Sequence, residues 1–412
     1  MVTTMQSEAR MPPPNEGRLE FANSLRGIAA LMVVYSHYVQ TFFLARPTIA
    51  AVANFPVLTE AECPNPFVLR MFPGLPMIEF ACLGITLFFI LSGFVIPFSF
   101  RRSTRSAFLV GRIFRLLPTY VCGLSVTLGM LWIGSWYYTR PFPHSLKTVL
   151  IHYVPGIRDV LWSPHIDCII WTLEIEVKFY LLCACLSRWL REGSLKVFAV
   201  PVVLAMAMGW LSPRLETLTG GQGRAYQLGQ VAALEVPFLI LMFIGVALNY
   251  RFRRMISLRT CILCVISIFA LFAATWSIGR PSSAFGSLWY YAGATILFAA
   301  ASTRPNWFKS NRLFGFFARI SYPLYVVHGI GGYVAMRIAI DHGWAAWQAL
   351  TLATASAIFI AWLIHVAVEA PSQRLGKSLA ARWFPFDDNR TTRAATPLAI
   401  KWWRAASRSA TG

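Results

Sequence analysis

The feature that most constrains this chain is its succession of long apolar segments. Ten runs are long enough, or nearly so, to cross the roughly 30 Å hydrocarbon core of a bilayer as helices. A soluble domain carries about 25% charged residues, whereas this 412-residue chain has 13% charged and 57% hydrophobic residues. The sequence therefore predicts an all-α, polytopic membrane helix bundle. The predicted spans are 24–44, 80–100, 114–138, 168–189, 196–212, 228–248, 259–277, 284–302, 317–338 and 347–369.

The distribution of lysine and arginine predicts the orientation of these spans. The net charge of +20 would suggest a nucleic-acid partner in a soluble protein. With both termini in the cytoplasm, however, the cytoplasmic segments hold 26 Lys and Arg residues and the outer segments hold eight. This asymmetry is the one that the positive-inside rule describes. We therefore expect both termini to be cytoplasmic and no nucleic acid to be bound.

The chain divides into three parts by composition. Residues 1–20 form a polar, Pro-rich cytoplasmic lead without the pattern of a cleavable signal. Residues 21–370 form the membrane-embedded domain, which lacks the internal repeat typical of many transporters. Residues 371–412 form a basic cytoplasmic tail, whose Trp383, Trp402 and Trp403 suit contact with anionic lipid as well as they suit a solvated tail.

Two long outer connections, 45–79 and 139–167, are expected to meet a polar ligand, and the second is expected to include a helix along the membrane surface. Cys63 and Cys168 fall in two segments that are expected to lie outside, and a disulfide between them is compatible with that location. Cys261 and Cys264 form a CxxC inside an apolar run without a second pair, so we interpret them as core residues and expect no metal.

The first span contains an ionisable pair on one helix face. Arg26 and His37 are eleven residues apart, about 1100° of helical rotation, so their side chains differ by only about 20° and by about 16 Å along the axis. Gly27 would allow another backbone or a ligand to approach. Arg26 is either a snorkelling anchor or a phosphate ligand. His37 is either a satisfied core histidine or a general base that works near pH 7.

Two further motifs lie in the second predicted span and at the start of the third. The run GITLFFILSGFVIPF contains Ser92, but the GxSxG nucleophile elbow is absent, so its small residues are expected to pack against the first span. Arg112 and Arg115 are three apart where the third span begins. The excess of basic residues that is usual in cytoplasmic loops explains several arginines here. This RxxR pair is also suited to bind the phosphates of a ligand from the cytoplasmic side.

The fourth span carries two carboxylates and a lysine in WTLEIEVKFY. Glu174 and Lys178 have i,i+4 spacing and are expected to neutralise each other. Glu176 points away from Glu174 and shares its face with Thr172 and Tyr180. Charged groups within a span are costly unless they are paired or face a wet cavity. Glu176 is therefore the stronger candidate for a functional carboxylate.

The last two predicted spans contain the remaining histidines of interest. Ser321, Tyr325 and His328 follow i, i+4, i+7 in SYPLYVVHG and share one face. In the tenth span, His365 and Glu369 are also i,i+4, which is compatible with structural pairing or with function. Pro371 is expected to end that helix. Glu235 is buried in the sixth span without a partner that the sequence identifies.

These pieces together resemble the integral-membrane acyltransferase-3 family, the O-acyltransferases of cell-surface carbohydrates. The resemblance runs in order from about residue 20 to residue 375. The matching pieces are RGIAALMVVYSH, LFFILSGF, RIFRLLPTY, WTLEIEVKFY and ISYPLYVVH. The resemblance implies a bacterial inner (plasma) membrane protein with ten core spans. It also implies transfer of an acyl group, often acetyl, from cytoplasmic acyl-CoA to a hydroxyl of a carbohydrate or glycolipid.

Family-critical positions map onto this chain by motif. The resemblance implies that Arg26, Arg112 and Arg115 bind acyl-CoA and that His37, Glu176 and His328 take part in catalysis. The C-terminal esterase-like module of some members is not expected here. Two alternatives compete with this interpretation: a transporter or flippase that moves a glycan precursor without acyl transfer, and a non-catalytic partner of a polysaccharide synthase. The acceptor, the acyl chain length and the oligomeric state have no readable motif.

Overall fold

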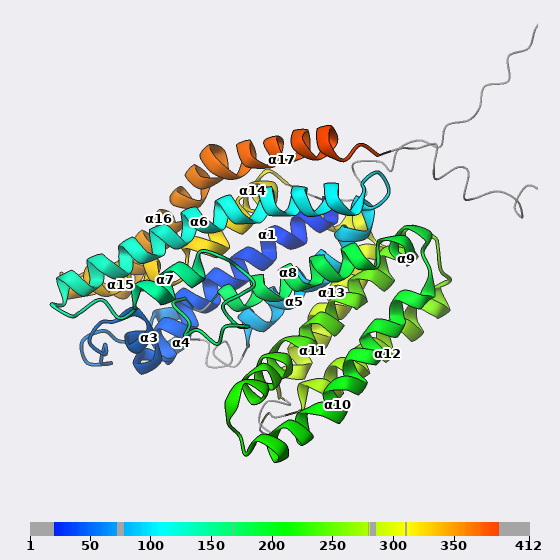
Figure 1. Cartoon of the computed structure of the whole chain (residues 1–412). Coiled ribbons are helices and arrows are strands. Elements are labelled where there is room, and N and C mark those ends of the chain that lie inside the picture. Colours follow the sequence, from blue (N-terminus) through cyan, green and yellow to red (C-terminus); the bar gives the residue numbers. More distant parts are fainter. Residues whose placement is uncertain are drawn as a thin grey trace, which may run out of the picture.

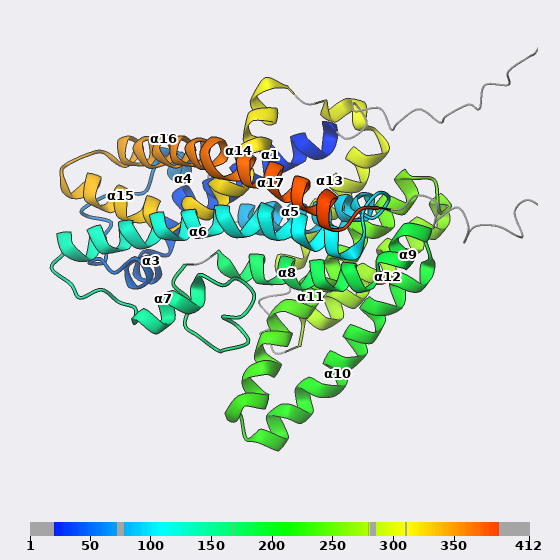
Figure 2. The same ribbon diagram turned by 45° about the horizontal axis from the view of Figure 1, so that its top comes forward.

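The computed structural model describes residues 20–386 except 72–77, 168, 279, 281–285 and 310. Every regular element in the described part is helical, which confirms the predicted all-α class. The helices run side by side as an elongated bundle with α1 at its centre (Figures 1 and 2). The Trp402 and Trp403 positions and the Cys168 half of the proposed disulfide lie outside the described residues, so those expectations stay predictions.

Helices occupy all ten predicted spans. They are α1 (Glu20–Tyr35), continued by a π-helical turn (Ser36–Thr41) and α2 (Phe42–Leu44), then α5 (Phe80–Ser99), α6 (Arg105–Tyr137), α8 (Ile170–Cys185), α10 (Ala199–Thr219), α11 (Gly223–Phe252), α12 (Leu258–Trp276), α13 (Leu288–Thr303), α14 (Arg312–Val327) with α15 (Ile330–Asp341), and α16 (Ala346–Ile364), which a π-helical turn (His365–Glu369) joins to α17 (Ala370–Trp383). The shorter helices are α3 (Arg46–Ala53), α4 (Phe67–Met71), α7 (Leu146–His152) and α9 (Ser187–Glu192).

Helix length supports fewer membrane spans among the described residues than the ten that the sequence pattern predicts. Among the described residues, seven helices are long and apolar enough to cross a membrane, and the bent pair α14–α15 makes an eighth. The helices α8 and α13 have 16 residues each, about 24 Å of rise, which is short of the usual 20 residues. The count of ten stays a prediction, as does the side of the membrane on which the termini lie.

Two of the predicted helix boundaries are wrong. The ninth span is not continuous over 317–338, because α14 ends at Val327 and α15 starts at Ile330 with a bend of 74° between them. Gly329 at the break has ψ of −117°, which is outside helical geometry. Pro371 does not end the tenth span, since it occupies the first turn of α17, where a proline needs no backbone donor. A π-helical turn directly precedes that first turn.

Small residues bring α1 close to both of its main neighbours. A Cβ at Gly27 would lie 2.7 Å from the carbonyl oxygen of Phe314, so the α1 and α14 backbones are in direct contact there. A Cβ at Gly84 of α5 would lie 2.9 Å from the carbonyl oxygen of Ala29. The expected close approach at Gly27 is thus confirmed, and helix α1 is held between α5 and α14.

The small residues of the second span pack in two directions: Gly84 packs against the first span, as expected, whereas the Ser92-Gly93 step packs against α11. A Cβ at Gly93 would lie 1.9 Å from the Met242 carbonyl oxygen, and one at Gly245 would lie 2.1 Å from the Ile90 carbonyl oxygen. The step therefore fits against α11 rather than against the first span. Two glycines facing each other allow α5 and α11 to pack with their backbones almost in contact.

This contact gives a stability prediction. Gly93→Ala should lower the free energy of unfolding by about 1–3 kcal/mol, because an added methyl group cannot be accommodated against backbone atoms. Gly129→Ala on α6 is the matched control, since no heavy atom lies within 4 Å of its Cβ position. The control should be neutral or slightly stabilising, because alanine is the better helix former. Thermal unfolding in detergent micelles compares the two. An unchanged midpoint for Gly93→Ala would contradict the close α5–α11 packing.

The two ends of the bundle differ in character. The outer connections, with α3 and α7, gather beside α15 at one end, and the start of α1 and the end of α17 lie at the other (Figures 1 and 2). Both described chain ends therefore lie at the same end of the bundle. Helices α10 and α12 form an outer layer against α11, and they expose large apolar side chains such as Met206, Trp210 and Leu263, as lipid-facing helices do.

Candidate active site

Two adjoining cavities lie among α1, α6 and α14. The central cavity is also lined by α5 and α8. The second cavity adds residues of the π-helical turn at 365–369 and of α17. Both cavities are lined by Arg26, Arg115, Ser321 and Tyr322, so these four side chains form the boundary between them.

Arg26 and Arg115 meet at this boundary without an anionic partner. No described carboxylate lies within ion-pair distance of either guanidinium. Glu176, in the central cavity, acts on Arg26 at longer range. Two unpaired guanidinium groups facing a cavity are a suitable site for phosphate oxygens, to which arginine donates in a planar, bidentate geometry.

Arg112, the other half of the RxxR pair, lines neither of the described cavities. Its guanidinium stacks on the rings of Phe108 and Tyr180, at 5.0 and 4.9 Å from their centroids, and it donates a hydrogen bond of 3.0 Å to Ser99. Residues three apart on a helix lie on neighbouring but distinct parts of its surface. Arg112 therefore supports Tyr180, while Arg115 faces the cavities.

Glu176 faces the central cavity and accepts two hydrogen bonds at one oxygen. The Tyr180 hydroxyl donates to Glu176 Oε1 over 2.5 Å, and the Ser92 hydroxyl donates to the same atom over 3.0 Å. The predicted shared face of Glu176, Thr172 and Tyr180 is confirmed by this bond and by the cavity lining. Ser92 thus donates its hydroxyl proton to a carboxylate at the wall of the central cavity.

The second cavity is lined by the predicted pair of the tenth span. His365 Nδ1 lies 2.6 Å from Glu369 Oε2, and Gln373 donates a hydrogen bond of 3.0 Å to the other oxygen of Glu369. Asn23 of α1 and Arg319 of α14 complete this polar wall. His365 lies at the start of the π-helical turn, a geometry that is frequent at functional sites.

His37 and His328 meet on the far side of the central cavity from the arginines. Their rings pack edge to face with centroids 4.8 Å apart, and His37 Nδ1 lies 2.6 Å from the Tyr333 hydroxyl. The His328 Nδ1–H donates to the Leu324 carbonyl oxygen over 3.0 Å, so its Nε2 carries the lone pair. That Nε2 is fully buried and has no partner among the described residues. Both imidazoles are held through Nδ1.

Tyr325 connects the central cavity to the histidine pair through a ring contact. Thr172 and Tyr325 line the cavity, and their hydroxyl oxygens lie 2.7 Å apart. The Tyr325 ring is 5.7 Å from the His328 ring, one turn farther along α14. From Arg26 to His37, the polar groups therefore follow α1 and α14 from the boundary of the two cavities, along the central cavity, to the histidine pair.

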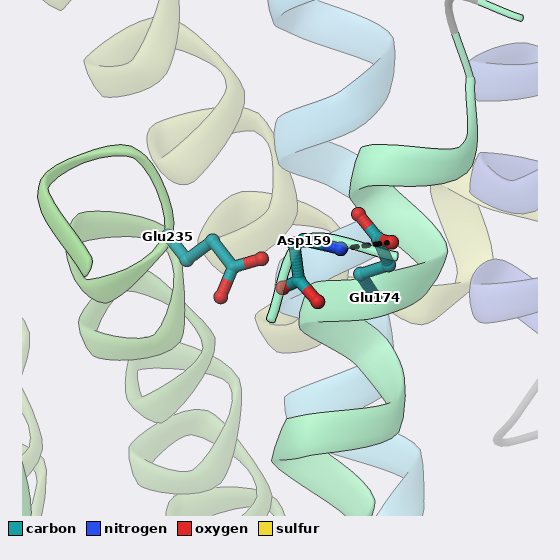
Figure 3. Close-up of side chains that lie close together, drawn as sticks. All are labelled: Asp159, Glu174 and Glu235. Atoms are coloured by element: carbon teal, nitrogen blue, oxygen red, sulfur yellow. Dashed lines mark hydrogen bonds between the residues drawn. The ribbon is translucent and has the colours of Figure 1, made fainter. Parts of the chain in front are cut away.

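A separate ion cluster fixes the second outer connection to the bundle. Arg158 donates to both oxygens of Glu174, over 2.9 and 2.5 Å. Lys178 pairs with Asp159 and also with Glu235, over 2.6 Å. Figure 3 shows the three carboxylates converging from this connection, α8 and α11. The predicted Glu174–Lys178 pair is therefore wrong, because each side chain reaches a partner on another element.

The cluster fits ion pairing better than metal binding. Oxygens of Asp159, Glu174 and Glu235 come within 4.8 Å of one another, as in a carboxylate metal site. The Arg158 and Lys178 cations, however, already occupy the positions between these carboxylates. Although burial alone would raise the pKa of Asp159, its hydrogen bonds with Glu235 and Lys178 bring the pKa below the ordinary value. A metal ion would have to displace both cations.

The comparisons with known proteins agree with this architecture. The family described as an acyltransferase domain matches residues 19–366. The chain is 25% identical over 345 residues to Nodulation protein 10 of Rhizobium leguminosarum bv. viciae, with 74% of this chain and 85% of that protein covered. No solved structure matches the chain. The helical bundle is that of a multi-pass membrane protein, and the matching family is one of acyltransferases. The chain belongs to the acyltransferase-3 family.

Three residues of the site were missed by reasoning from the sequence. Tyr333 contacts His37 through a bend that the continuous ninth span did not include. Tyr322 separates the two cavities and donates to the Leu116 carbonyl oxygen over 2.9 Å. Arg158 sits in a connection without regular periodicity. Only Tyr322 had a usable signal, since it directly follows Ser321 in a motif that had already been singled out.

Proposed function

We propose that this protein transfers an acyl group, such as acetyl, from cytoplasmic acyl-CoA to a hydroxyl of a carbohydrate or glycolipid at the bacterial inner membrane. The observation that carries the proposal is the position of unpaired Arg26 and Arg115 at one side of the central cavity and of the His37–His328 pair beyond Tyr325 at its other side. Two cationic groups suited to phosphate and a pair of imidazoles suited to accept a proton thus lie on opposite sides of one cavity. Coenzyme A has the matching shape, with phosphates at one end of a flexible arm and a thioester at the other.

The proposed reaction assigns one step to each group. Arg26 and Arg115 bind the phosphates of the donor, and its thioester lies beyond Glu176, towards His37. Tyr333 accepts the His37 Nδ1–H, which leaves the Nε2 lone pair to take the proton of the acceptor hydroxyl. The hydroxyl oxygen then attacks the thioester carbonyl, the carbon–sulfur bond breaks, and the CoA thiolate recovers the proton. The products are an ester and free CoA.

The arginines provide a test that is specific for the donor. Arg26→Ala or Arg115→Ala should raise the KM for acetyl-CoA about 10- to 150-fold, the equivalent of losing a charge-assisted hydrogen bond of about 1.5–3 kcal/mol. The KM for S-acetyl-N-acetylcysteamine, which carries the thioester without any phosphate, should change much less. Steady-state kinetics in proteoliposomes with both donors make this comparison.

A matched variant controls for charge removal. Arg312, exposed at the start of α14, lines neither cavity, and Arg312→Ala should leave both KM values unchanged. Equal increases in KM for the two donors in Arg26→Ala would show that this arginine does not recognise phosphate.

A further inference from the structure

Asp167 has a buried carboxylate oxygen that no other described group uses. The residue ends the second outer connection, and its Oδ1 accepts hydrogen bonds from the backbone N–H groups of Ile169 and Ile170, over 3.2 and 2.9 Å. Oδ1 thereby caps the start of α8. Oδ2 has no hydrogen-bond partner, although the residue is only 1% exposed. Helix capping accounts for one oxygen of this carboxylate and leaves the other unexplained.

Tyr120 presents a second buried polar atom in the same region. Its hydroxyl has no partner among the described residues, and the side chain is 1% exposed. Of the charged groups near this hydroxyl, Asp167 has the largest electrostatic effect. One turn earlier on α6, the Leu116 carbonyl oxygen accepts from Tyr322, and one turn later Gly123 packs on Val326. Tyr120 therefore lies level with the cavity-lining part of α14.

These two atoms lie beside the route from the central cavity to the histidine pair. Thr172 donates a hydrogen bond of 2.9 Å to the Ile169 carbonyl oxygen, which places it next to the cap formed by Asp167. Its other contact is with Tyr325, whose ring adjoins His328. The unpartnered His328 Nε2 is thus a third buried atom close to the same level.

We propose that Tyr120 and Asp167 form a subsite that binds a hydroxyl of the acceptor sugar next to the hydroxyl that is acylated. A hydroxyl is both donor and acceptor, so it can donate to Asp167 Oδ2 and accept from the Tyr120 O–H at once. An anionic group would be repelled by the carboxylate. The inference rests on the proposed function and adds how the acceptor is recognised, from a residue of the outer connection expected to meet the ligand.

Conservative variants test the subsite without removing the helix cap. Asp167→Asn keeps a side-chain oxygen for the start of α8, since asparagine caps helices as well as aspartate does. Tyr120→Phe removes only the hydroxyl. The glycolipid fraction extracted from the source membranes serves as acceptor probe, and its half-saturating concentration is measured with labelled acetyl-CoA. We expect the half-saturating concentration of the acceptor to rise about 10-fold or more in Asp167→Asn and about 5-fold in Tyr120→Phe. The KM for acetyl-CoA should stay unchanged in both variants.

The outcomes separate this inference from the proposed function. Tyr153→Phe is the control, because the Tyr153 hydroxyl contacts Ser125 at an exposed position away from the cavity, and its kinetics should equal those of the wild type. Transfer by the wild type together with unchanged acceptor saturation in Asp167→Asn and Tyr120→Phe would overturn the subsite alone. Absence of transfer by the wild type would contradict the proposed function and, with it, the inference. If the KM for acetyl-CoA and the half-saturating acceptor concentration rose together in Asp167→Asn and Tyr120→Phe, both residues would have a purely structural role and the subsite would be overturned.

Discussion

His37→Ala is expected to lower the rate of acyl transfer about 10²- to 10⁴-fold, the range that a general base contributes. The position of His37 supports this role, because its ring centroid lies 4.8 Å from that of His328 and its Nδ1 contacts the Tyr333 hydroxyl. The pair lies on the far side of the central cavity from the arginines. Single-turnover transfer of labelled acetyl groups in proteoliposomes measures the effect directly. The KM for acetyl-CoA should change little, because its phosphates bind at the opposite end.

His342→Ala is the matched control for this variant. His342 is exposed after the end of α15, and its Nδ1 contacts the Ile338 carbonyl oxygen, so its loss should leave the rate unchanged. Retention of at least a third of the wild-type rate by a folded His37→Ala protein would remove His37 from the role of base. The neighbouring His328 would then be the remaining imidazole for that role.

Arg158→Met is expected to cost about 3–5 kcal/mol of folding free energy, because it leaves the fully buried Glu174 carboxylate without its bidentate partner. Unfolding by SDS titration in mixed micelles measures this change. The double variant Arg158→Met/Glu174→Gln should recover most of the loss, since it removes the uncompensated charge together with its partner.

A surface pair supplies the control for Arg158. Arg188 and Glu192 form an i,i+4 pair of 3.0 Å with 80% and 52% of their side-chain surfaces exposed. Arg188→Met should therefore change the free energy of unfolding by no more than about 0.5 kcal/mol. If Arg158→Met were no more destabilising than Arg188→Met, the buried cluster would not be what holds the outer connection to α8.

The sequence was most informative where helical periodicity alone determines geometry. Within one helix, spacing correctly placed Glu176 with Tyr180, and His365 with Glu369. Gly27 was correctly expected to be a point of close approach. These arguments hold because residues on one helix keep a fixed rotation and rise.

Spacing failed wherever a partner lies on another element. The i,i+4 position of Glu174 and Lys178 favoured a local pair, yet Arg158 and Glu235 reach them across the bundle and satisfy each charge better. No periodicity within α8 contains that information. Similarly, the apolar run continues through the bend after His328, so the length of the run predicted one continuous span. The glycines at 329, 331 and 332 mark the break, but they do not indicate that Tyr333 turns back towards His37.

The kind of site is thus better predicted from the sequence than the role of each residue within it. The RxxR pattern indicated two equivalent arginines, but only Arg115 lines the described cavities, and Arg112 stacks on Tyr180. Positions three apart on a helix differ by about 60° around the axis and about 4.5 Å along it. Helical spacing therefore cannot predict that Phe108, Tyr180 and Ser99 engage Arg112 while Arg115 lines the cavities.

The central claim is that this membrane protein moves an acyl group from acyl-CoA onto a sugar hydroxyl, and one labelling experiment tests it most directly. Membranes from source cells that contain the wild type, His37→Ala or Arg26→Ala are incubated with [¹⁴C]acetyl-CoA, and alkali-labile label is counted in the glycan and glycolipid fraction. The account predicts ester-linked label with the wild type and almost none with either variant. Equal labelling by all three, or none with the wild type while labelled material crosses the membrane unchanged, would contradict it.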